Sequence, residues 1–318
     1  MKEIAVILPA YNEEATIENT LAAFFEELPD AFFVVVNNNS TDRTQEVAEQ
    51  AFRRLGARGR VLCESRKGKG NAVRTALFSI IADVYVLCDA DMTYPAGQVH
   101  KLLQPVLEET ADIVVGDRRI NGNYARENKR GFHQFGNDLV VGLVNRLFKA
   151  KLNDIMSGYR VISRRFARNY PILVEGFEIE TDMTLYALDK RYRIVEVPVD
   201  YVDRPEGSES KLNTFRDGMK VLLVIFNIFR HYKPLVFFSW MAMLFLLFAI
   251  AFGVPVIGDW IQYRYIYHVP SAILASSLVL LSFLCFALGL ILDSISFQER
   301  MRVEREMLGA RHKLDRNG

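Results

Sequence analysis

The stretch Val84-Tyr85-Val86-Leu87-Cys88-Asp89-Ala90-Asp91 joins a run of apolar residues to two carboxylates that stand two residues apart. The apolar run predicts a buried strand, and residues two apart on an extended chain point to the same side. Asp89 and Asp91 can therefore share one hard divalent cation, such as Mg²⁺ or Mn²⁺, and that ion would bridge phosphate groups. The alternative is that Asp-Ala-Asp only caps the helix that follows.

The chain around this stretch alternates between strand-like and helix-like segments. Five apolar runs have the length and residue types of strands. They are Ile4–Leu8, Phe32–Val36, Arg60–Cys63, Val84–Cys88 and Ile113–Val115. Helical periodicity lies between them, as in Ile17–Leu28 and Ala72–Ile81. This alternation predicts a doubly wound, Rossmann-like α/β domain.

Polar clusters follow four of the predicted strands. They are Pro9 to Glu13, Asn37 to Asp42, Lys67 to Asn71, and Asp89 to Asp91. Each cluster alone also suits an ordinary helix cap or turn. In a doubly wound sheet, however, ligands bind at the carboxyl ends of the strands. Four polar strand ends on one edge therefore predict a binding site.

The composition excludes some classes of protein. The 318 residues are half hydrophobic and carry a formal net charge of +1, so the chain can bury a domain core and shows no bias toward nucleic acid. Cys63, Cys88 and Cys285 are widely spaced, which indicates neither a disulfide framework nor a zinc site. The first residues lead into an apolar strand without a secretory signal, so we expect the N-terminal region to stay in the cytoplasm.

Two long runs toward the C-terminal end carry no charge. They extend from Leu235 to Ile257 and from Val269 to Leu292, and each exceeds the roughly 20 residues that cross a bilayer core. They predict two transmembrane helices, because buried helices of soluble proteins rarely stay uncharged over this length. Basic residues flank the pair on both outer sides, and the link between the runs holds only Arg264. The positive-inside rule then places both chain ends in the cytoplasm, at the inner (plasma) membrane.

These patterns divide the chain into four parts. We expect a cytoplasmic domain at 1–212, an interfacial amphipathic helix at 213–233, two transmembrane helices with a short non-cytoplasmic loop at 234–292, and a basic cytoplasmic tail at 293–318.

Seven motifs carry a resemblance to a known family. They are LPAYNEE (8–14), VVVNNNSTDRT (34–44), KGKGNAVRTAL (67–77), LCDADMTYP (87–95), VVGDR (114–118), MSGYR (156–160) and GSESKL (207–212). Their order and spacing resemble the family-2 inverting glycosyltransferases, which have a GT-A type fold. With the two apolar runs, the chain resembles the polyprenyl-phosphate monosaccharide transferases, a group that includes dolichyl-phosphate mannose synthase and bacterial undecaprenyl-phosphate enzymes. The Gln-x-x-Arg-Trp motif of processive synthases is absent from the sequence.

The resemblance implies which residues bind a nucleotide sugar. It assigns the metal on the donor diphosphate to Asp89 and Asp91, and Thr93 is expected to be a third metal ligand. The other donor-binding residues that it implies are Pro9, Tyr11, Glu13, Asn38, Lys69 and Ala90. The leaving diphosphate gains negative charge, and a divalent ion with a nearby cation stabilises it. We expect Arg204 and Lys211 to supply that cation from a closing loop, although a basic loop that meets anionic lipid is the alternative.

The identity of the donor base depends on Asn38, where the family usually has Asp. An amide can accept from the uracil N3–H while it donates to a neighbouring carbonyl, whereas guanine offers two adjacent donors that favour a carboxylate. Thr93 and Glu178 also depart from the residues that the mannose branch places there. The sequence therefore favours a UDP-sugar, such as UDP-glucose or UDP-N-acetylglucosamine, with GDP-mannose as the alternative.

The expected acceptor is a polyprenyl phosphate. A dense basic cluster lies between Gly116 and Gly131, and the resemblance assigns the lipid phosphate to Arg118 and Arg130 within it. A solvated loop is the other interpretation of this cluster. A phosphate monoester is already ionised near neutral pH, so the reaction needs no general base. Glu180 and Asp182 are therefore expected to position groups or to contact sugar hydroxyls.

Other classes of function fit fewer of these features. A non-catalytic membrane scaffold has no need of the paired carboxylates, and a nucleotidyltransferase does not explain the interfacial helix. A P-loop is excluded, because Gly68-Lys69-Gly70-Asn71 lacks the required spacing. The expected partners are a nucleotide sugar, a polyprenyl phosphate and a membrane, without nucleic acid, and a homo-oligomer is left open.

Overall fold

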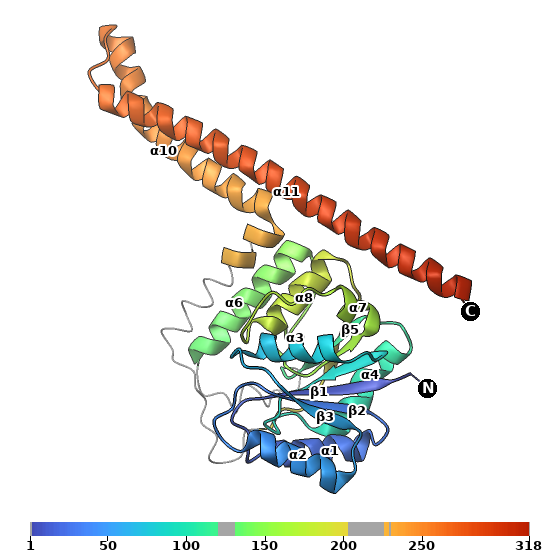
Figure 1. Ribbon diagram of the computed structural model, residues 1–318. Helices are drawn as coiled ribbons and strands as arrows, with labels where there is room; N and C mark the ends of the chain where they lie inside the picture. Colours follow the sequence, from blue (N-terminus) through green and yellow to red (C-terminus); the bar gives the residue numbers. More distant parts are fainter. Residues whose placement is uncertain (1, 120–130, 203–225, 229, 318) are drawn as a thin grey trace. The chain divides into compact units, whose positions relative to one another are not determined.

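The computed structural model describes residues 2–119, 131–202, 226–228 and 230–317. For 131–137 and 307–317 it describes the backbone only. The chain forms two compact units, Met1–Val221 and Leu222–Gly318. The first unit contains a β-sheet with helices around it, and the second contains two long helices (Figure 1).

The described part of the first unit contains a mixed sheet of seven strands in the order β3-β2-β1-β4-β6-β5-β7. The strands are β1 (Ile4–Ala10), β2 (Phe32–Asn37), β3 (Gly59–Cys63), β4 (Val84–Leu87), β5 (Ile113–Asp117), β6 (Arg160–Ser163) and β7 (Ile194–Pro198). β1 pairs in parallel with β2 and β4, whereas β6 runs antiparallel to its neighbours β4 and β5. The central strands are continuous apolar runs, as expected where both faces of a sheet are covered.

Helices cover both faces of this sheet, with α3 and α8 over one face and α1 and α2 over the other (Figure 1). The helices are α1 (Ile17–Glu27), α2 (Thr44–Leu55), α3 (Lys69–Ser79), α4 (Val99–Leu107), α6 (Gly131–Phe148), α7 (Arg164–Asn169) and α8 (Ile179–Asp189), with a 3₁₀ turn η1 (Ala96–Gln98) before α4. A buried cluster that includes Leu21, Phe24 and Phe33 fixes α1 on the sheet. This packing holds the ends of β1, β2 and β4 at one edge.

The five predicted strands are all present, each within one or two residues of its expected ends. The helix expected at Ala72–Ile81 begins earlier, at Lys69, so the Gly-Lys-Gly segment forms its first turn. β6 and β7 were not expected. β6 is antiparallel and separates β4 from β5, so the sheet is mixed, and the predicted GT-A type α/β fold is confirmed.

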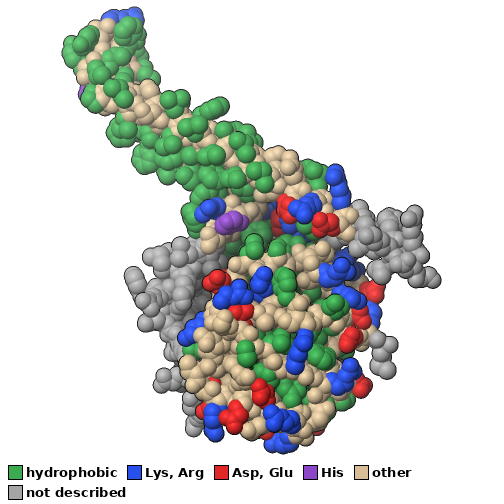
Figure 2. Space-filling model, viewed as in Figure 1, with side chains coloured by type: hydrophobic (Ala, Val, Ile, Leu, Met, Phe, Trp, Pro, Cys, Tyr) green, Lys and Arg blue, Asp and Glu red, His purple; other side chains and the backbone are tan. Residues whose placement is uncertain are grey.

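The second unit consists of α10 (Pro234–Tyr263) and α11 (Val269–Asn317), which contain the two predicted apolar runs. Each helix holds an 18-residue window with a mean hydropathy of 2.5, so both are long and apolar enough to cross a membrane. Large apolar side chains such as Leu247 and Phe283 are exposed along them, and Figure 2 shows the apolar surface of the pair. The Ser282 hydroxyl donates to the Ala242 carbonyl over 2.7 Å and ties the two helices together.

The predicted interfacial helix at 213–233 falls mostly outside the described residues. Of that segment, 226–228 and 230–233 are described, and all of these residues except 233 are helical. The four-part division of the chain therefore stays a prediction.

Candidate functional site

The loops that follow β1 and β2 are tied together by amide and hydroxyl side chains. The Asn12 N–H donates to Ser40 Oγ over 3.1 Å, and the Thr41 N–H donates to Asn12 Oδ1 over 2.8 Å. Asn12 and Asn39 have φ angles of 55° and 58°, a left-handed conformation that asparagine adopts more readily than most residues. The predicted donor residues on this side are Pro9, Tyr11 and Glu13, at the end of β1 and in the loop after it.

The Asn38 side chain holds the segment that follows β3. Its Nδ2 donates to the Arg66 carbonyl over 2.6 Å, and its Oδ1 accepts from the Gly68 N–H over 2.7 Å. An amide oxygen has two lone pairs, so this contact leaves Oδ1 the capacity to accept a second N–H. Asn38 therefore stabilises the loop, a role that the sequence did not reveal, and it remains a candidate contact to the base.

Glu64 fixes the same segment by ionic contacts. Its carboxylate accepts from the Arg66 Nε over 2.9 Å and from the Arg66 Nη2 and the Thr75 hydroxyl. The hydrogen bond from Arg66 outweighs burial and, with that from Thr75, lowers the pKa of Glu64 to about 2. Lys67, in the same segment, donates to the Tyr11 hydroxyl over 3.4 Å. The path from β3 to α3 therefore has a defined shape.

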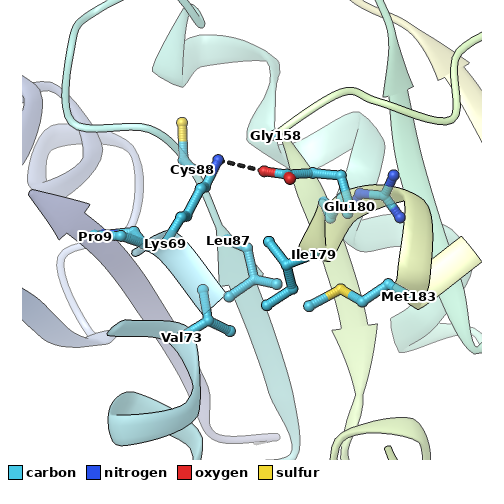
Figure 3. Close-up of a pocket in the computed structure, with 10 residues that line it drawn as sticks. Pro9, Lys69, Val73, Leu87, Cys88, Gly158, Ile179, Glu180 and Met183 are labelled. Atoms are coloured by element: carbon cyan, nitrogen blue, oxygen red, sulfur yellow. Dashed lines mark ion pairs between the residues drawn. The ribbon is translucent and has the colours of Figure 1, made fainter. Parts of the chain in front are cut away.

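Lys69 lies between two carboxylates from distant parts of the chain. Its ammonium forms ion pairs with Asp89, which follows β4, and with Glu180 in the first turn of α8, where the N–O distance is 2.5 Å. Figure 3 shows Lys69 and Glu180 pointing toward each other across a small pocket. Burial alone would lower the pKa of Lys69, but Asp89 and Glu180 raise it above its ordinary value. Lys69 is therefore a fixed positive charge at the end of β4.

Gly158 completes the wall of this pocket. A Cβ placed on Gly158 would lie 2.5 Å from Asp89 Oδ2 and 2.8 Å from Lys69 Nζ, both far inside normal contact distance. The Gly158 N–H donates to the Tyr94 hydroxyl over 3.0 Å, which holds the backbone in this position. The MSGYR motif therefore brings bare backbone against the Asp89 and Lys69 pair.

Asp91 is buried beside Thr93. The Thr93 hydroxyl donates to Asp91 Oδ1 over 2.6 Å, and the Thr93 N–H reaches the same oxygen over 3.2 Å. The residue between them, Met92, has a φ of 61°, which is uncommon for a side chain of this size and costs conformational energy. In this structure Thr93 orients the Asp91 carboxylate, and its predicted role as a metal ligand remains a prediction.

The chemistry of these donors fits a divalent metal that is shared with a substrate. Among the described residues, no group of three or more His, Cys, Asp or Glu side chains is arranged to hold a metal ion. Within the described part of the chain, Asp89 and Asp91 would therefore be the carboxylates that hold the metal. Mg²⁺ is commonly held in this way, by one or two carboxylates with substrate phosphates and water as the remaining ligands.

The acidic residues around the start of α8 have different environments. Glu180 is buried against Lys69, whereas Asp182 accepts from the Tyr170 hydroxyl over 2.7 Å. Glu178 precedes the helix and accepts from the Gly176 N–H over 3.3 Å. Of the three, Glu180 is the one that reaches the pocket beside Asp89.

Arg118 is buried at the end of β5 in a bidentate ion pair. Its Nε and Nη2 donate to Asp154 over 2.7 and 2.9 Å, and its Nη1 donates to the Tyr94 hydroxyl over 3.3 Å. Burial opposes ionisation of Asp154, but the Arg118 guanidinium lowers the pKa of that carboxyl below its ordinary value. The pairing with Asp154 was not foreseen. The other predicted residues for the acceptor and the leaving group, Arg130, Arg204 and Lys211, lie outside the described residues.

Arg160 was quoted within the MSGYR motif but received no role. Its side chain is fully buried and donates to the Ser157 and Ile155 carbonyls over 2.8 and 2.7 Å. It also donates to the Thr184 hydroxyl in α8 over 2.9 Å. Arg160 thereby joins the 155–158 loop to the helix that carries Glu180. In the sequence, the one sign of this role is that an arginine begins an apolar run.

Two known proteins similar to this chain are named as sugar transferases. Glycosyltransferase AglJ of Haloferax volcanii is 30% identical over 306 residues, which cover 95% of this chain and 96% of AglJ. The dolichyl-phosphate hexose transferase of the same organism is 30% identical, over 69% of this chain and 90% of its own length.

A solved structure with a similar fold is glucosyl-3-phosphoglycerate synthase of Mycobacterium tuberculosis in complex with Mg²⁺ and uridine diphosphate. It is 25% identical, with a TM-score of 0.54, and the match covers 70% of this chain and 79% of that chain. The family described as Glycosyl transferase family 2 matches residues 5–170. The mixed sheet, the paired carboxylates after β4 and these matches lead to one conclusion: the chain belongs to glycosyltransferase family 2, and it is a glycosyltransferase.

Proposed function

We propose that this glycosyltransferase transfers a single sugar from a nucleotide sugar to a polyprenyl phosphate, with inversion at the anomeric carbon. The products are a polyprenyl-phosphate monosaccharide and a nucleoside diphosphate. Two observations support this acceptor: a relative that covers 69% of the chain is named a dolichyl-phosphate hexose transferase, and α10 and α11 are suited to a membrane.

The observation that carries the proposal is the group formed by Asp89, Asp91 and Lys69 at the edge of the sheet. A divalent metal held by Asp89 and Asp91 would neutralise charge on the leaving diphosphate. Lys69 adds a positive charge that is fixed by two carboxylates and largely shielded from water, where electrostatic effects are stronger than in solvent. Arg204 and Lys211 are proposed to add further positive charge when the donor is bound.

The acceptor phosphate is proposed to bind at Arg118 and Arg130. A phosphate monoester attacks as an anion, so no side chain has to remove a proton. The ion pair of Glu180 with Lys69 is consistent with this, because a carboxylate held by an ammonium group is poorly placed to act as a base. We assign Glu180 to holding Lys69, and inversion then follows from one in-line displacement that converts an α-linked donor into a β-linked product.

The proposed donor is a UDP-sugar. The Asn38 amide donates to a backbone carbonyl and retains capacity to accept at Oδ1, as recognition of uracil N3–H requires. The similar synthase of Mycobacterium tuberculosis was solved with uridine diphosphate and Mg²⁺, which supports the same nucleotide and metal here.

The chain is proposed to be an integral protein of the inner membrane, with the catalytic unit and both ends in the cytoplasm. The supporting features are the two membrane-suited helices and the basic residues on their outer flanks. The reaction would then take place at the bilayer surface, where the lipid phosphate lies.

The experiment that tests this function combines purified enzyme with a panel of radiolabelled UDP- and GDP-sugars. Polyprenyl phosphate is the acceptor, and the matched polyprenol without phosphate is the control. We expect transfer from a UDP-sugar to the phosphate only, with a β linkage in the product. Transfer from GDP-mannose instead would identify a mannose-type enzyme, and transfer to the free alcohol would overturn the acceptor assignment.

A further inference from the structure

Four large apolar side chains are strongly exposed on the first unit. They are Phe78 at 76%, Ile81 at 74%, Leu173 at 83% and Phe177 at 82% of their full accessible area. We call these four residues the apolar rim. Single exposed apolar residues are common on soluble proteins, but several on neighbouring segments indicate a surface that contacts something.

The apolar rim lies on two segments that are bonded together at both ends. At one end, the Arg164 N–H donates to the Asp83 carbonyl over 2.9 Å, just beyond Ile81. At the other, the Gly70 N–H donates to the Gly176 carbonyl over 3.2 Å. The loop between α7 and α8, with Leu173 and Phe177, therefore meets the first turn of α3, while Phe78 and Ile81 lie toward the other end, near the start of α7.

The contact between these segments is too close to be a loose loop. A Cβ placed on Gly70 would lie 2.2 Å from the Val174 carbonyl oxygen, and one on Gly68 would lie 2.1 Å from the Glu175 carbonyl oxygen. The backbones therefore touch at these points. Leu173 and Phe177 are exposed because of a fixed backbone path, and they are presented as a defined surface.

Phe78 has a partner that suits a membrane interface. The guanidinium of Arg74, one turn earlier on α3, lies 4.5 Å from the centre of the Phe78 ring. An arginine over an aromatic ring can keep its charge at the level of lipid phosphates while the ring enters the apolar layer. Aromatic and basic residues gather at this depth in membrane proteins.

We propose that the apolar rim is a surface through which the catalytic unit contacts the lipid bilayer. The choice of a bilayer rests on the proposed function in one respect, that α10 and α11 hold the chain in a membrane. It goes further by assigning a second, separate contact. Lys69 lies between the two glycines that contact the loop, and Phe177 is three residues before Glu180, so the segments that carry the apolar rim also carry two residues of the site.

The test uses the full-length protein with Cys63 replaced by serine and Cys285 by alanine. Cys88 can remain, because it is buried and a label cannot reach it. Single cysteines are introduced as Leu173→Cys or Phe177→Cys and carry a nitroxide label. The protein is placed in vesicles of phosphatidylethanolamine and phosphatidylglycerol, and collisions of the label with oxygen and with a water-soluble nickel complex are compared.

Two matched controls bracket the result. Glu46→Cys lies on the exposed side of α2, across the sheet from α3, and reports water contact. Leu247→Cys, exposed in α10, reports lipid contact if α10 spans the membrane. We expect the labels at 173 and 177 to collide with oxygen in preference to nickel, severalfold more than the label at position 46. Labelled protein that has not entered the vesicles should show no such preference.

Each outcome has one meaning. Lipid contact at 247 with water contact at 173 and 177 overturns the bilayer surface and leaves the proposed function intact. Water contact at 173, 177 and 247 overturns the membrane-spanning assignment and the bilayer surface together. Shielding at 173 and 177 that comes with spin coupling between labels indicates a second copy of this chain on the apolar rim, which also overturns the proposal.

Discussion

Two regions at the carboxyl edge of the sheet use different chemistry for neighbouring tasks. After β1 and β2, the side-chain amides of Asn12 and Asn38 form hydrogen bonds with the backbone of adjacent loops, and these contacts join neutral groups. After β4, the ammonium of Lys69 is held by the carboxylates of Asp89 and Glu180. We call the first the amide region, which fixes the shape of the loops, and the second the charged region, which fixes the electrostatic field at the end of β4. Substitutions should therefore affect turnover most in the charged region and substrate preference most in the amide region.

The largest effect is expected from Asp91→Ala in the charged region. Loss of a proposed metal carboxylate should reduce transfer by about 10²- to 10³-fold or more, the range seen when one electrostatic contact to a transition state is removed. The freed Thr93 hydroxyl costs only about 1–3 kcal/mol, so the protein should stay folded. Asp30→Ala, at an exposed turn before β2, is the matched control.

Initial rates and UDP-dependent binding of Mn²⁺, followed by electron paramagnetic resonance, measure this effect. Full activity of Asp91→Ala, or of the wild type in excess chelator, would remove the metal from the mechanism.

The second effect is expected from Lys69→Met. This change leaves Asp89 and Glu180 facing each other without the cation, and breaking a buried ion pair in this way costs about 3–5 kcal/mol. The double variant Lys69→Met with Glu180→Gln should recover part of that loss, because it removes one of the facing charges. Denaturant unfolding of both variants, with the exposed Lys101→Met as control, measures the difference. Equal stability of the single and double variants would show that the two carboxylates do not interact.

A smaller effect, on preference, is expected from Asn38→Asp in the amide region. A carboxylate cannot donate to the Arg66 carbonyl, so the variant should lose about 1–3 kcal/mol of stability. UDP should raise the melting temperature of the wild type more than GDP does. The difference between the two nucleotides should be smaller in the Asn38→Asp variant. Asn38→Ala separates the two causes, since it removes the loop contact without adding charge. Greater stabilisation of the wild type by GDP would reverse the assignment of the base.

The smallest effect is expected from Glu64→Gln and depends on pH. The hydrogen bonds from Arg66 and Thr75 lower the pKa of Glu64 from its usual 4.5 to about 2, although burial acts in the opposite direction. The stabilisation is therefore complete above pH 4.5 and is lost as the pH falls toward 2. The wild type should be more stable than the variant at pH 7, with a difference that shrinks across this window. A constant difference between pH 6 and pH 2.5 would show that Glu64 does not titrate as described.

The parts of the fold that depend on neighbours in the sequence were predictable. β1 to β5 are apolar runs of ordinary length, and the carboxylates after β4 were visible as an extension of such a run. β6 is four residues long and starts with Arg160, whose side chain donates to two carbonyls and a hydroxyl that only the folded chain brings together. β7 contains Glu196 and ends at Pro198, so its apolar pattern is broken.

The site divides in the same way. Asp89, Asp91 and Lys69 were named from local motifs, but the Lys69 and Glu180 pair joins two helices far apart in the chain. The Arg118 and Asp154 pair likewise depends on how β5 packs against the loop before β6. Such contacts form between elements whose arrangement is a tertiary property, and no local pattern encodes them.

The bare backbone at Gly158 has a consequence for how mutational scans of this enzyme are interpreted. An added methyl group there would lie 2.5 Å from Asp89 Oδ2 and 2.8 Å from Lys69 Nζ, so Gly158→Ala is expected to displace these two side-chain ends and to lower activity. Yet Gly158 has no side chain with which to perform chemistry. A survey that ranks positions by lost activity would place it among the catalytic residues, and only a separate measurement of nucleotide affinity and folding would reveal that the position excludes atoms instead of supplying them.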